Sequence, residues 1–352
     1  METIDTKVAK AIPPGVYASP EALALHREMI VFDCLSLFYL LDSPYVERAL
    51  EGGVTATNVT MAAEGETFDK ALENINTAHD KIAKHPDLIL ATTAADIREA
   101  KKKGKVAIIL GTQGSGAIGK ELGRVGLLHK LGIRYIGLAY TGATLLADGC
   151  GEPRNAGLTF LGKEFIEVVN GLPLILDLSH TGHRSRLEAA QLATNPVCTH
   201  SNAYSVNAND RNTKDEVARI IAQKGGVMGV CGLVRSVAPK DSDIEHMLDH
   251  ADHWIRTVGL EHTGIGLDFV EGYQDAHKAG KSMPQTHRWR ALRPDIFGTS
   301  EEFFTQEYPT GLQTIRQLPN FTHGLLERGY KPDQVREVMG GAWLRNFESA
   351  VG

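Results

Sequence analysis

The chain has 352 residues, of which 42% are hydrophobic and 23% are charged, a composition typical of a folded globular protein. Its formal net charge of −6 argues against a nucleic-acid or anionic-membrane partner, and the one dense basic run, at 101–105, is predicted to be the solvated end of a helix. No apolar run approaches 18 residues and the N-terminus has no apolar core, so we expect neither a membrane span nor a signal peptide. Four separated cysteines without a C-x-x-C pair predict a reduced, cytoplasmic protein.

Eight short apolar segments, taken in chain order, are predicted to be strands. Most of them are nearly continuous apolar runs, as expected of strands that are buried on both faces. Amphipathic helical stretches separate many of them, and a glycine often ends such a helix just before the next strand. The predicted strands are residues 29–37, 54–61, 105–113, 133–140, 173–180, 196–201, 226–234 and 262–269.

This alternation favours an α/β fold, a (β/α)₈ barrel of the TIM type. The competing fold is an open doubly wound sheet, but no G-x-G-x-x-G opens a helix after the first strand, and the glycine-rich run at 111–119 lacks the lysine of a phosphate-binding loop. We therefore expect a single barrel domain over residues 1–352. Within it we expect an N-terminal extension over 1–28, an irregular excursion over 271–312 and a helical ending over 321–351.

Five of the predicted strands end in a polar side chain. In a barrel of this kind the carboxyl ends of the strands meet at one mouth, where the active site lies. Two neutral imidazoles with an oxygen donor suit zinc, and a free carboxylate nearby suits a general base that takes a proton from water. The polar strand ends are Gln113, Tyr140, His180, His200 and Asp268.

His180 and His200 are the predicted metal ligands. A single histidine at a strand end is more commonly a hydrogen-bonded structural residue, but two on adjacent strands, with Asp268 at the same rim, favour a metal site. His183 follows in the next loop and is expected to support the ligands from behind. Three other histidines have helical spacing and no accompanying strand end, so we expect them on a surface helix; they are His246, His250 and His253.

Several segments together carry a family likeness. They are "LDLSH" at 176–180, "THSNAYSV" at 199–206, the pair Arg211 and Asn212, "HTGIGLDF" at 262–269 and "MGGAWLRNF" at 339–347. In this combination the sequence resembles the membrane (renal-type) dipeptidase family, peptidase family M19 of the amidohydrolase superfamily, over residues 29 to 348. The resemblance implies a (β/α)₈ barrel that hydrolyses dipeptides with a two-zinc centre and is often a homodimer.

The resemblance also implies roles for individual residues. His180 and His200 match the two histidines that bind the second zinc, and Asp268 matches the acid/base aspartate. Arg211 matches the arginine that binds the substrate carboxylate, for which its planar guanidinium is suited, and Asn212 beside it is expected to contact substrate. Tyr140 stands where many members have a histidine that contacts the substrate.

The first strand departs from the family pattern. Members typically have Asp-Gly-His-Asn-Asp there, whose histidine and second aspartate bind the first zinc, whereas this chain has "DCLSL" at 33–37. Both ligand positions, 35 and 37, are leucine, and strand alternation predicts that they face the mouth while Cys34 and Ser36 face away. The bridging glutamate of the family is Gln113 here. The departures therefore predict a single metal, most simply zinc, held by His180, His200 and the Gln113 oxygen.

Three functions follow as hypotheses. The first is a hydrolase with one metal that cleaves an amide or related carbon–nitrogen bond in a small carboxylate-bearing substrate, with Asp268 as base and Arg211 as the carboxylate ligand. The second is a lyase, decarboxylase or isomerase that uses Asp268 and the two histidines with one metal or none. The third is a binding protein without catalysis. For each we expect a cytoplasmic homodimer whose partner is a small molecule.

Overall fold

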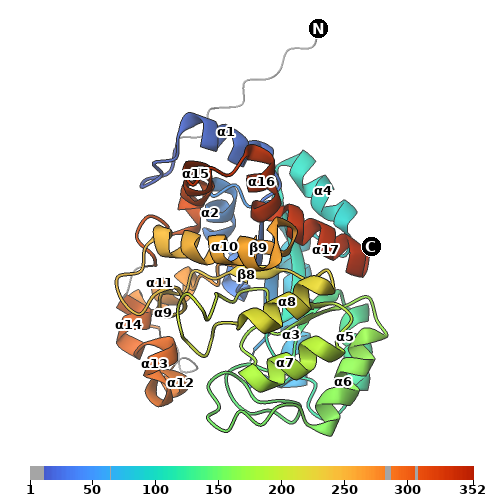
Figure 1. Ribbon diagram of the computed structural model, residues 1–352. Coiled ribbons are helices and arrows are strands. Elements are labelled where there is room, and N and C mark those ends of the chain that lie inside the picture. Colours follow the sequence, from blue (N-terminus) through green and yellow to red (C-terminus); the bar gives the residue numbers. More distant parts are fainter. Residues whose placement is uncertain (1–11, 64, 282–286, 306–307) are drawn as a thin grey trace.

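Eight parallel strands form the centre of the computed structural model, which describes residues 12–63, 65–281, 287–305 and 308–352 (Figure 1). Their order in the sheet is β7-β6-β5-β4-β2-β1-β9-β8, and a parallel bridge between Cys198 and Met228 joins the two ends of this sheet into a barrel. The strands are β1 (Phe32–Ser36), β2 (Ala56–Ala62), β4 (Val106–Thr112), β5 (Ile133–Gly137), β6 (Ile175–Asp177), β7 (Pro196–Val197), β8 (Met228–Val230) and β9 (Thr263–Ile265).

The predicted barrel is thus confirmed: seven of its eight strands lie within a predicted segment, and β2 passes the end of its segment by one residue, Ala62. The strands are shorter than the apolar runs, and in most of them the last residues of the run belong to the loops at the mouth. One further strand, β3 (Leu88–Leu90), was not predicted from the sequence. It pairs with Val106–Ile108 at the amino end of β4, whereas β5 pairs with Leu110–Thr112 further along the same strand.

Helices surround the barrel on its outside (Figure 1). Helix α4 illustrates the local chemistry: Thr93 and Asp96 form a capping box at its start, and Lys101, Lys102 and Lys103 occupy its last turn, where cations are favoured. This confirms the prediction for residues 101–105. The α-helices that come before the last strand are α1 (Pro20–Glu28), α2 (Tyr45–Glu51), α3 (Phe68–Lys84), α4 (Ala94–Lys103), α5 (Gly123–Lys130), α6 (Phe160–Asn170), α7 (His183–Leu192), α8 (Asp215–Gln223), α9 (Val234–Val237) and α10 (Ile244–Val258).

The last third of the chain is more helical than predicted. Residues 271–312 were expected to be irregular, but their described part contains four short α-helices that gather at the lower left of Figure 1. The helical ending over 321–351 is confirmed. The helices are α11 (Glu271–Lys278), α12 (His287–Leu292), α13 (Pro294–Phe297), α14 (Ser300–Thr305), α15 (Pro319–Glu327), α16 (Pro332–Arg336) and α17 (Ala342–Val351).

Helix α17 closes the barrel at the amino ends of its strands. Trp343 of this helix lies with Phe32 in one buried apolar cluster and donates a hydrogen bond from Nε1 to the carbonyl of Ile265 at 3.0 Å. Phe347 stacks on Tyr135 of β5 with ring centroids 6.0 Å apart. Any side chain at Gly264 would meet Trp343 Nε1 at 2.2 Å, so β9 requires glycine there.

The histidines of α10 differ from the prediction of a surface helix. His250 is fully buried because its helix packs on the loop after β7: its Nδ1 accepts from the backbone N–H of Ala203 at 3.2 Å, and its Nε2 lies 2.8 Å from the carbonyl of Val237. His253 lies at the rim of that contact and pairs with Asp215 at 2.8 Å. Of these three side chains, that of His246 is the most exposed, at 45%.

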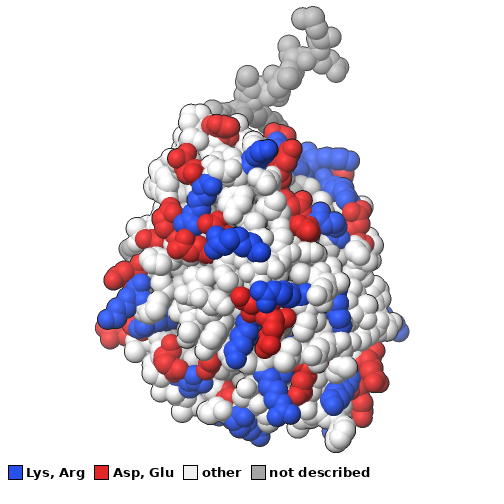
Figure 2. Space-filling model, in the orientation of Figure 1, with Lys and Arg blue, Asp and Glu red and all other residues white. Residues whose placement is uncertain are grey.

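The surface carries charges of both signs. Lys and Arg side chains alternate with Asp and Glu over the face in Figure 2, with one basic cluster over α4. Among the described residues, no helix combines the length and apolar character that a bilayer crossing requires. All four cysteines are free and buried, as expected for thiols that act as small apolar residues.

Candidate functional site

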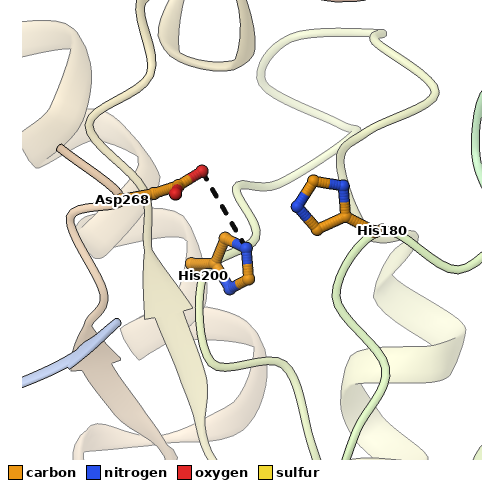
Figure 3. A group of neighbouring side chains, drawn as sticks. All are labelled: His180, His200 and Asp268. Atoms are coloured by element: carbon orange, nitrogen blue, oxygen red, sulfur yellow. Dashed lines mark ion pairs between the residues drawn. The ribbon is translucent and has the colours of Figure 1, made fainter. Parts of the chain in front are cut away.

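Three buried side chains meet at the carboxyl ends of the strands (Figure 3). His180, His200 and Asp268 each lie three residues beyond the last residue of a strand, respectively β6, β7 and β9. One potential ligand atom of each lies within 4.8 Å of those of the other two. The three residues that sequence reasoning placed at one mouth are therefore brought together, in a group that can hold a metal ion.

Two of these three residues have strained backbones. His180 has a φ of 65° and Asp268 a φ of 55°, in the left-handed region that side chains other than glycine rarely adopt. Surrounding hydrogen bonds hold these conformations: the His180 carbonyl accepts from the N–H of Cys150 at 2.6 Å, and the residue before Asp268 donates its N–H to Asp33 Oδ1 at 2.7 Å. Strain of this kind gathers at functional sites, where surrounding structure maintains it.

A hydrogen-bonded chain fixes the orientation of His200. The hydroxyl of Thr199 donates to Asp177 Oδ2 at 2.6 Å and lies 2.6 Å from His200 Nδ1. Because its one proton goes to the carboxylate, this hydroxyl accepts from Nδ1–H, which places the His200 proton on Nδ1. Nε2 therefore keeps its lone pair, and it faces Asp268 Oδ2 at 3.9 Å. This is how metal-binding histidines are usually oriented.

His180 has no comparable support from hydrogen bonds. Neither of its ring nitrogens has a hydrogen-bond partner among the described residues, although both are buried. Its ring instead stacks on Tyr140, with centroids 4.0 Å apart and planes 19° apart. Burial lowers the pKa of His180 and of His200 well below the usual value, so both imidazoles are neutral and able to bind a metal.

Asp268 has the properties of an acid/base group. Burial raises the pKa of its carboxyl to about 7, while the positive charges of Arg211 and Arg290 oppose that rise. A carboxyl with a pKa near neutrality exists in both protonation states at working pH, so it can take a proton and return it.

A cavity of about 180 Å³, the main cavity, opens in front of this group. Gln113, His180 and Asp268 line it, as does Tyr140. The amide nitrogen of Gln113 donates to Thr60 Oγ1 at 2.8 Å, and its amide oxygen has no partner within the described part of the chain. That oxygen is therefore available to a metal or to substrate.

The end of β1 supplies apolar side chains to the site. Leu37 lines the main cavity, and Leu35 is only 1% exposed. Because a leucine side chain carries no donor atom, neither residue can bind a second metal. The prediction that Cys34 and Ser36 face the same way is wrong. Cys34 joins the apolar cluster inside the barrel, whereas Ser36 accepts a hydrogen bond from Thr57 on the outside. The cause is an irregularity in the β1–β2 pairing between positions 33 and 36, which shifts the alternation by one residue.

Arg211 is a buried cation at a second, smaller cavity of about 30 Å³, the side pocket. It is 1% exposed, and none of its guanidinium nitrogens has a hydrogen-bond partner among the described residues. Its loop is held by Arg186, which donates to the carbonyl of Asn212 at 2.8 Å and to that of Arg211 at 3.4 Å. A buried charge without a partner is costly, and the described residues offer the Arg211 guanidinium none, so this side chain is suited to bind an anion.

Asn212 and His183 lie away from the two cavities. The Asn212 amide donates to the carbonyls of Asn207 and Ser236 at 3.0 and 2.9 Å, which stabilises the loop that carries Arg211. His183 lies 3.3 Å from Asp210 and beside the ring of Tyr204 rather than behind the metal-binding group. Neither side chain lines the main cavity or the side pocket.

Several lining residues were not found by sequence reasoning. Trp289 and Arg290 come from α12, and Glu66 from the loop after β2, segments in which no periodic pattern points to a site. Thr199 and Asp177 do have a signal in the sequence, since Thr199 lies one residue before His200 and Asp177 lies three residues before His180.

Comparisons with known proteins agree on one family. The family model for membrane dipeptidase, peptidase family M19, matches residues 23–284. Dipeptidase tcpJ of Claviceps purpurea (strain 20.1) is 25% identical over 256 residues, covering 71% of this chain and 52% of its own length. Dipeptidase verJ of Clonostachys rogersoniana is 29% identical over 211 residues, with coverages of 59% and 54%. The chain therefore matches about half the length of these two relatives.

A solved structure matches over nearly the full length of both chains. The crystal structure of an amidohydrolase from Pseudomonas aeruginosa has a TM-score of 0.80 and is 28% identical in sequence. The match covers 94% of this chain and 99% of that one.

Proposed function

Because the chain belongs to the membrane dipeptidase family, peptidase family M19, we propose that it is a metal-dependent hydrolase that cleaves an amide bond in a small, carboxylate-bearing substrate. The observation that carries the proposal is the geometry of one mouth. Two neutral imidazoles and a carboxyl of pKa about 7 lie next to a buried arginine whose guanidinium has no hydrogen-bond partner among the described residues. A dipeptide offers an amide carbonyl to the first group and a carboxylate to the second.

The donor atoms fit one metal ion. His180 and His200 Nε2 are buried without hydrogen-bond partners among the described residues, and so is the Gln113 amide oxygen. We propose that these atoms hold one ion, zinc by the chemistry of the donors, with Asp268 close enough to join them. A second ion does not fit, because Leu35 and Leu37 offer no ligand and an amide is a poor bridge between two cations.

Each residue then has a defined task. Arg211 binds the substrate carboxylate with its planar guanidinium and so fixes the amide at the mouth. A metal held by His180 and His200 would supply Lewis acidity, the chemistry that polarises a carbonyl and makes water more acidic. Asp268 takes a proton from the attacking water as the C–O bond forms, and gives it to the amine nitrogen as the C–N bond breaks. Tyr140, stacked on His180, holds that ring in place.

We also propose the oligomeric state, the domain organisation and the location of the protein. A homodimer is proposed from the family resemblance alone, and a single domain from the continuous barrel. A cytoplasmic location is supported by four buried, free cysteines, which a reducing compartment would preserve.

The proposal is tested with protein stripped of metal by a chelator and dialysed. Titration with Zn²⁺ should give one equivalent per chain and should restore hydrolysis of L-Ala-L-Ala, while His180→Ala and His200→Ala should each abolish tight binding. Reaction in ¹⁸O-labelled water should place the label in the released carboxylate. Turnover without label would favour the lyase or isomerase alternative, and activity that persists without any metal would contradict the proposal.

A further inference from the structure

A third cavity, the outer cavity, lies beside the main cavity and is larger, at about 630 Å³. Tyr140 and Trp289 line both of these cavities, so the two spaces meet at this pair of aromatic side chains. The side pocket, which Arg211 lines, shares four other residues with the main cavity and, among the described residues, none with the outer cavity. The main cavity, with the metal-binding group, therefore lies between the side pocket and the outer cavity.

One wall of the outer cavity is the glycine-rich run that follows β4. Gly114, Gly116 and Gly119 line it together with Ser115, whose hydroxyl donates to the carbonyl of Leu138 at 2.7 Å. Gly114 and Gly119 have φ values of 116° and 60°, which favour glycine. Gly116 has no such φ, and a Cβ there would meet no heavy atom beyond its chain neighbours, among the described residues, closer than 3.6 Å. Glycine at this position is therefore not required by the backbone, and its effect is to leave space in the cavity.

A hydrogen-bonded loop presents apolar side chains to the outer cavity. Leu145 and Leu146 line it, and Leu145 is 59% exposed. The Thr144 hydroxyl donates to the carbonyl of Ala147 at 3.0 Å and accepts from the N–H of Leu146 at 3.1 Å. The Thr159 hydroxyl donates to the carbonyl of Leu145 at 2.7 Å. These bonds hold the loop in place, so the Leu145 side chain stays at the cavity and is suited to contact an apolar group of a ligand.

The charge of the outer cavity disfavours an ammonium group. Its described lining residues include one cation, Arg288, and neither aspartate nor glutamate. The Arg288 guanidinium lies 5.4 Å from the centroid of the Trp289 ring. Because like charges repel, a protonated amine is unfavourable here, whereas an uncharged apolar or aromatic group meets the Trp289 ring and the Leu145 side chain without such a cost.

We propose that the substrate extends beyond a dipeptide on the amino side of the scissile amide, through an uncharged acyl group that occupies the outer cavity. The order of the three spaces carries this inference: the carboxylate binds at Arg211, the amide lies at the metal-binding group, and the extension passes Tyr140 and Trp289. The inference rests on the proposed function for that orientation. A plain dipeptide would leave empty of substrate the outer cavity, which is larger than the other two cavities combined.

The test uses three ligands that differ only at the amino end. Each is an analogue of L-Ala-L-Ala in which a CH₂ group replaces the scissile N–H, so that none is cleaved. The first has a free amine, the second carries an acetyl group on that amine, and the third carries a phenylacetyl group. The acetyl ligand controls for the lost positive charge, because Glu66 lines the main cavity and would attract an ammonium group. Binding is measured by isothermal titration calorimetry with zinc-loaded protein.

The wild type should bind the phenylacetyl ligand on the order of tenfold more tightly than the acetyl ligand, because an apolar ring is buried. Gly116→Leu fills the space and should remove most of this preference. Leu145→Ser, at an exposed position that folding does not depend on, should reduce it. The matched control is Gly126→Leu on α5, where an added Cβ meets nothing within 4 Å and which lines none of the three cavities; it should keep the preference. Equal thermal unfolding of the variants excludes a folding defect.

The outcomes separate this inference from the proposed function. If the wild type prefers the phenylacetyl ligand, and Gly116→Leu or Leu145→Ser lowers that preference while Gly126→Leu keeps it, the inference stands even if L-Ala-L-Ala is not hydrolysed. If the wild type binds the phenylacetyl ligand no more tightly than the acetyl ligand, the inference is refuted even if L-Ala-L-Ala is cleaved. It is also refuted if neither cavity variant lowers the preference, or if Gly126→Leu lowers it equally.

Discussion

Replacing Thr199 by valine should weaken zinc binding by about 10- to 100-fold. Valine keeps the shape of threonine but removes the hydroxyl that lies 2.6 Å from both Asp177 Oδ2 and His200 Nδ1. His200 then loses the acceptor that holds its proton on Nδ1, so the tautomer with a proton on Nε2 competes for the ring. In that tautomer the nitrogen facing Asp268 has no lone pair for a metal.

Two independent arguments give a similar size for this loss of zinc affinity. Loss of an outer hydrogen-bond partner of a metal-binding histidine typically costs 10- to 100-fold in affinity. Leaving a buried donor without an acceptor costs about 1–3 kcal/mol, which corresponds to roughly a 5- to 150-fold change in a binding constant. His200 is completely buried, so water cannot replace the missing acceptor and the full cost should apply.

The assay is competition between protein and a chromophoric chelator for Zn²⁺. Thr199→Ser is the control, because serine keeps the hydroxyl and should retain affinity close to that of the wild type. Nitrogen NMR of the metal-free protein gives an independent measure, since the two ring tautomers differ in their ¹⁵N shifts. Wild-type affinity in the valine variant would refute the reasoning, and so would equal losses in the serine and valine variants, which would indicate a steric cause.

Three further predictions concern other parts of the site. Burial raises the pKa of Asp33 to about 7, so the folded state keeps a proton that the unfolded chain releases near pH 4. The free energy of unfolding should therefore fall by up to about 4 kcal/mol as the pH rises from about 4 to 7. Urea unfolding of Asp33→Asn should show a shallower decline over that pH range. Gln113→Glu should tighten zinc binding in the same chelator competition by tenfold or more, because the oxygen donor becomes anionic; unchanged affinity would exclude residue 113 as a ligand. Arg186→Lys should lower the unfolding free energy by about 1–3 kcal/mol and raise KM, because the carbonyls of the Arg211 loop lose their donors; an unchanged KM would show that Arg211 does not depend on this support.

The barrel and the core of its site could be predicted because the signals for both lie within short segments of the sequence. Each buried strand is a nearly continuous apolar run, and the polar residue that ends the run marks the mouth. His180, His200 and Asp268 were found in this way, and the structure places them together. Two leucines in place of ligands on the first strand were equally readable, because the family pattern has a fixed spacing.

The remaining features depend on contacts between distant segments. Arg290 reaches the site only because α12 folds over the mouth, and no periodicity in residues 271–312 indicates that path. His250 has the spacing of a surface residue but is buried by the loop after β7. The shifted alternation of β1 arises from its pairing with β2, so it cannot be read from β1 alone.

The hydrogen bond between Asp33 and Leu267 implies an order of assembly. His180 and His200 are only twenty residues apart, whereas this bond joins residues separated by 234 positions. Closing the longer loop costs about 2 kcal/mol more in chain entropy, and such distant contacts form late in folding. A partly folded chain would therefore bring its two imidazoles together first. Asp268 would reach them only when the first and last strands meet, so the acid/base group would be the last of the three side chains to take its place.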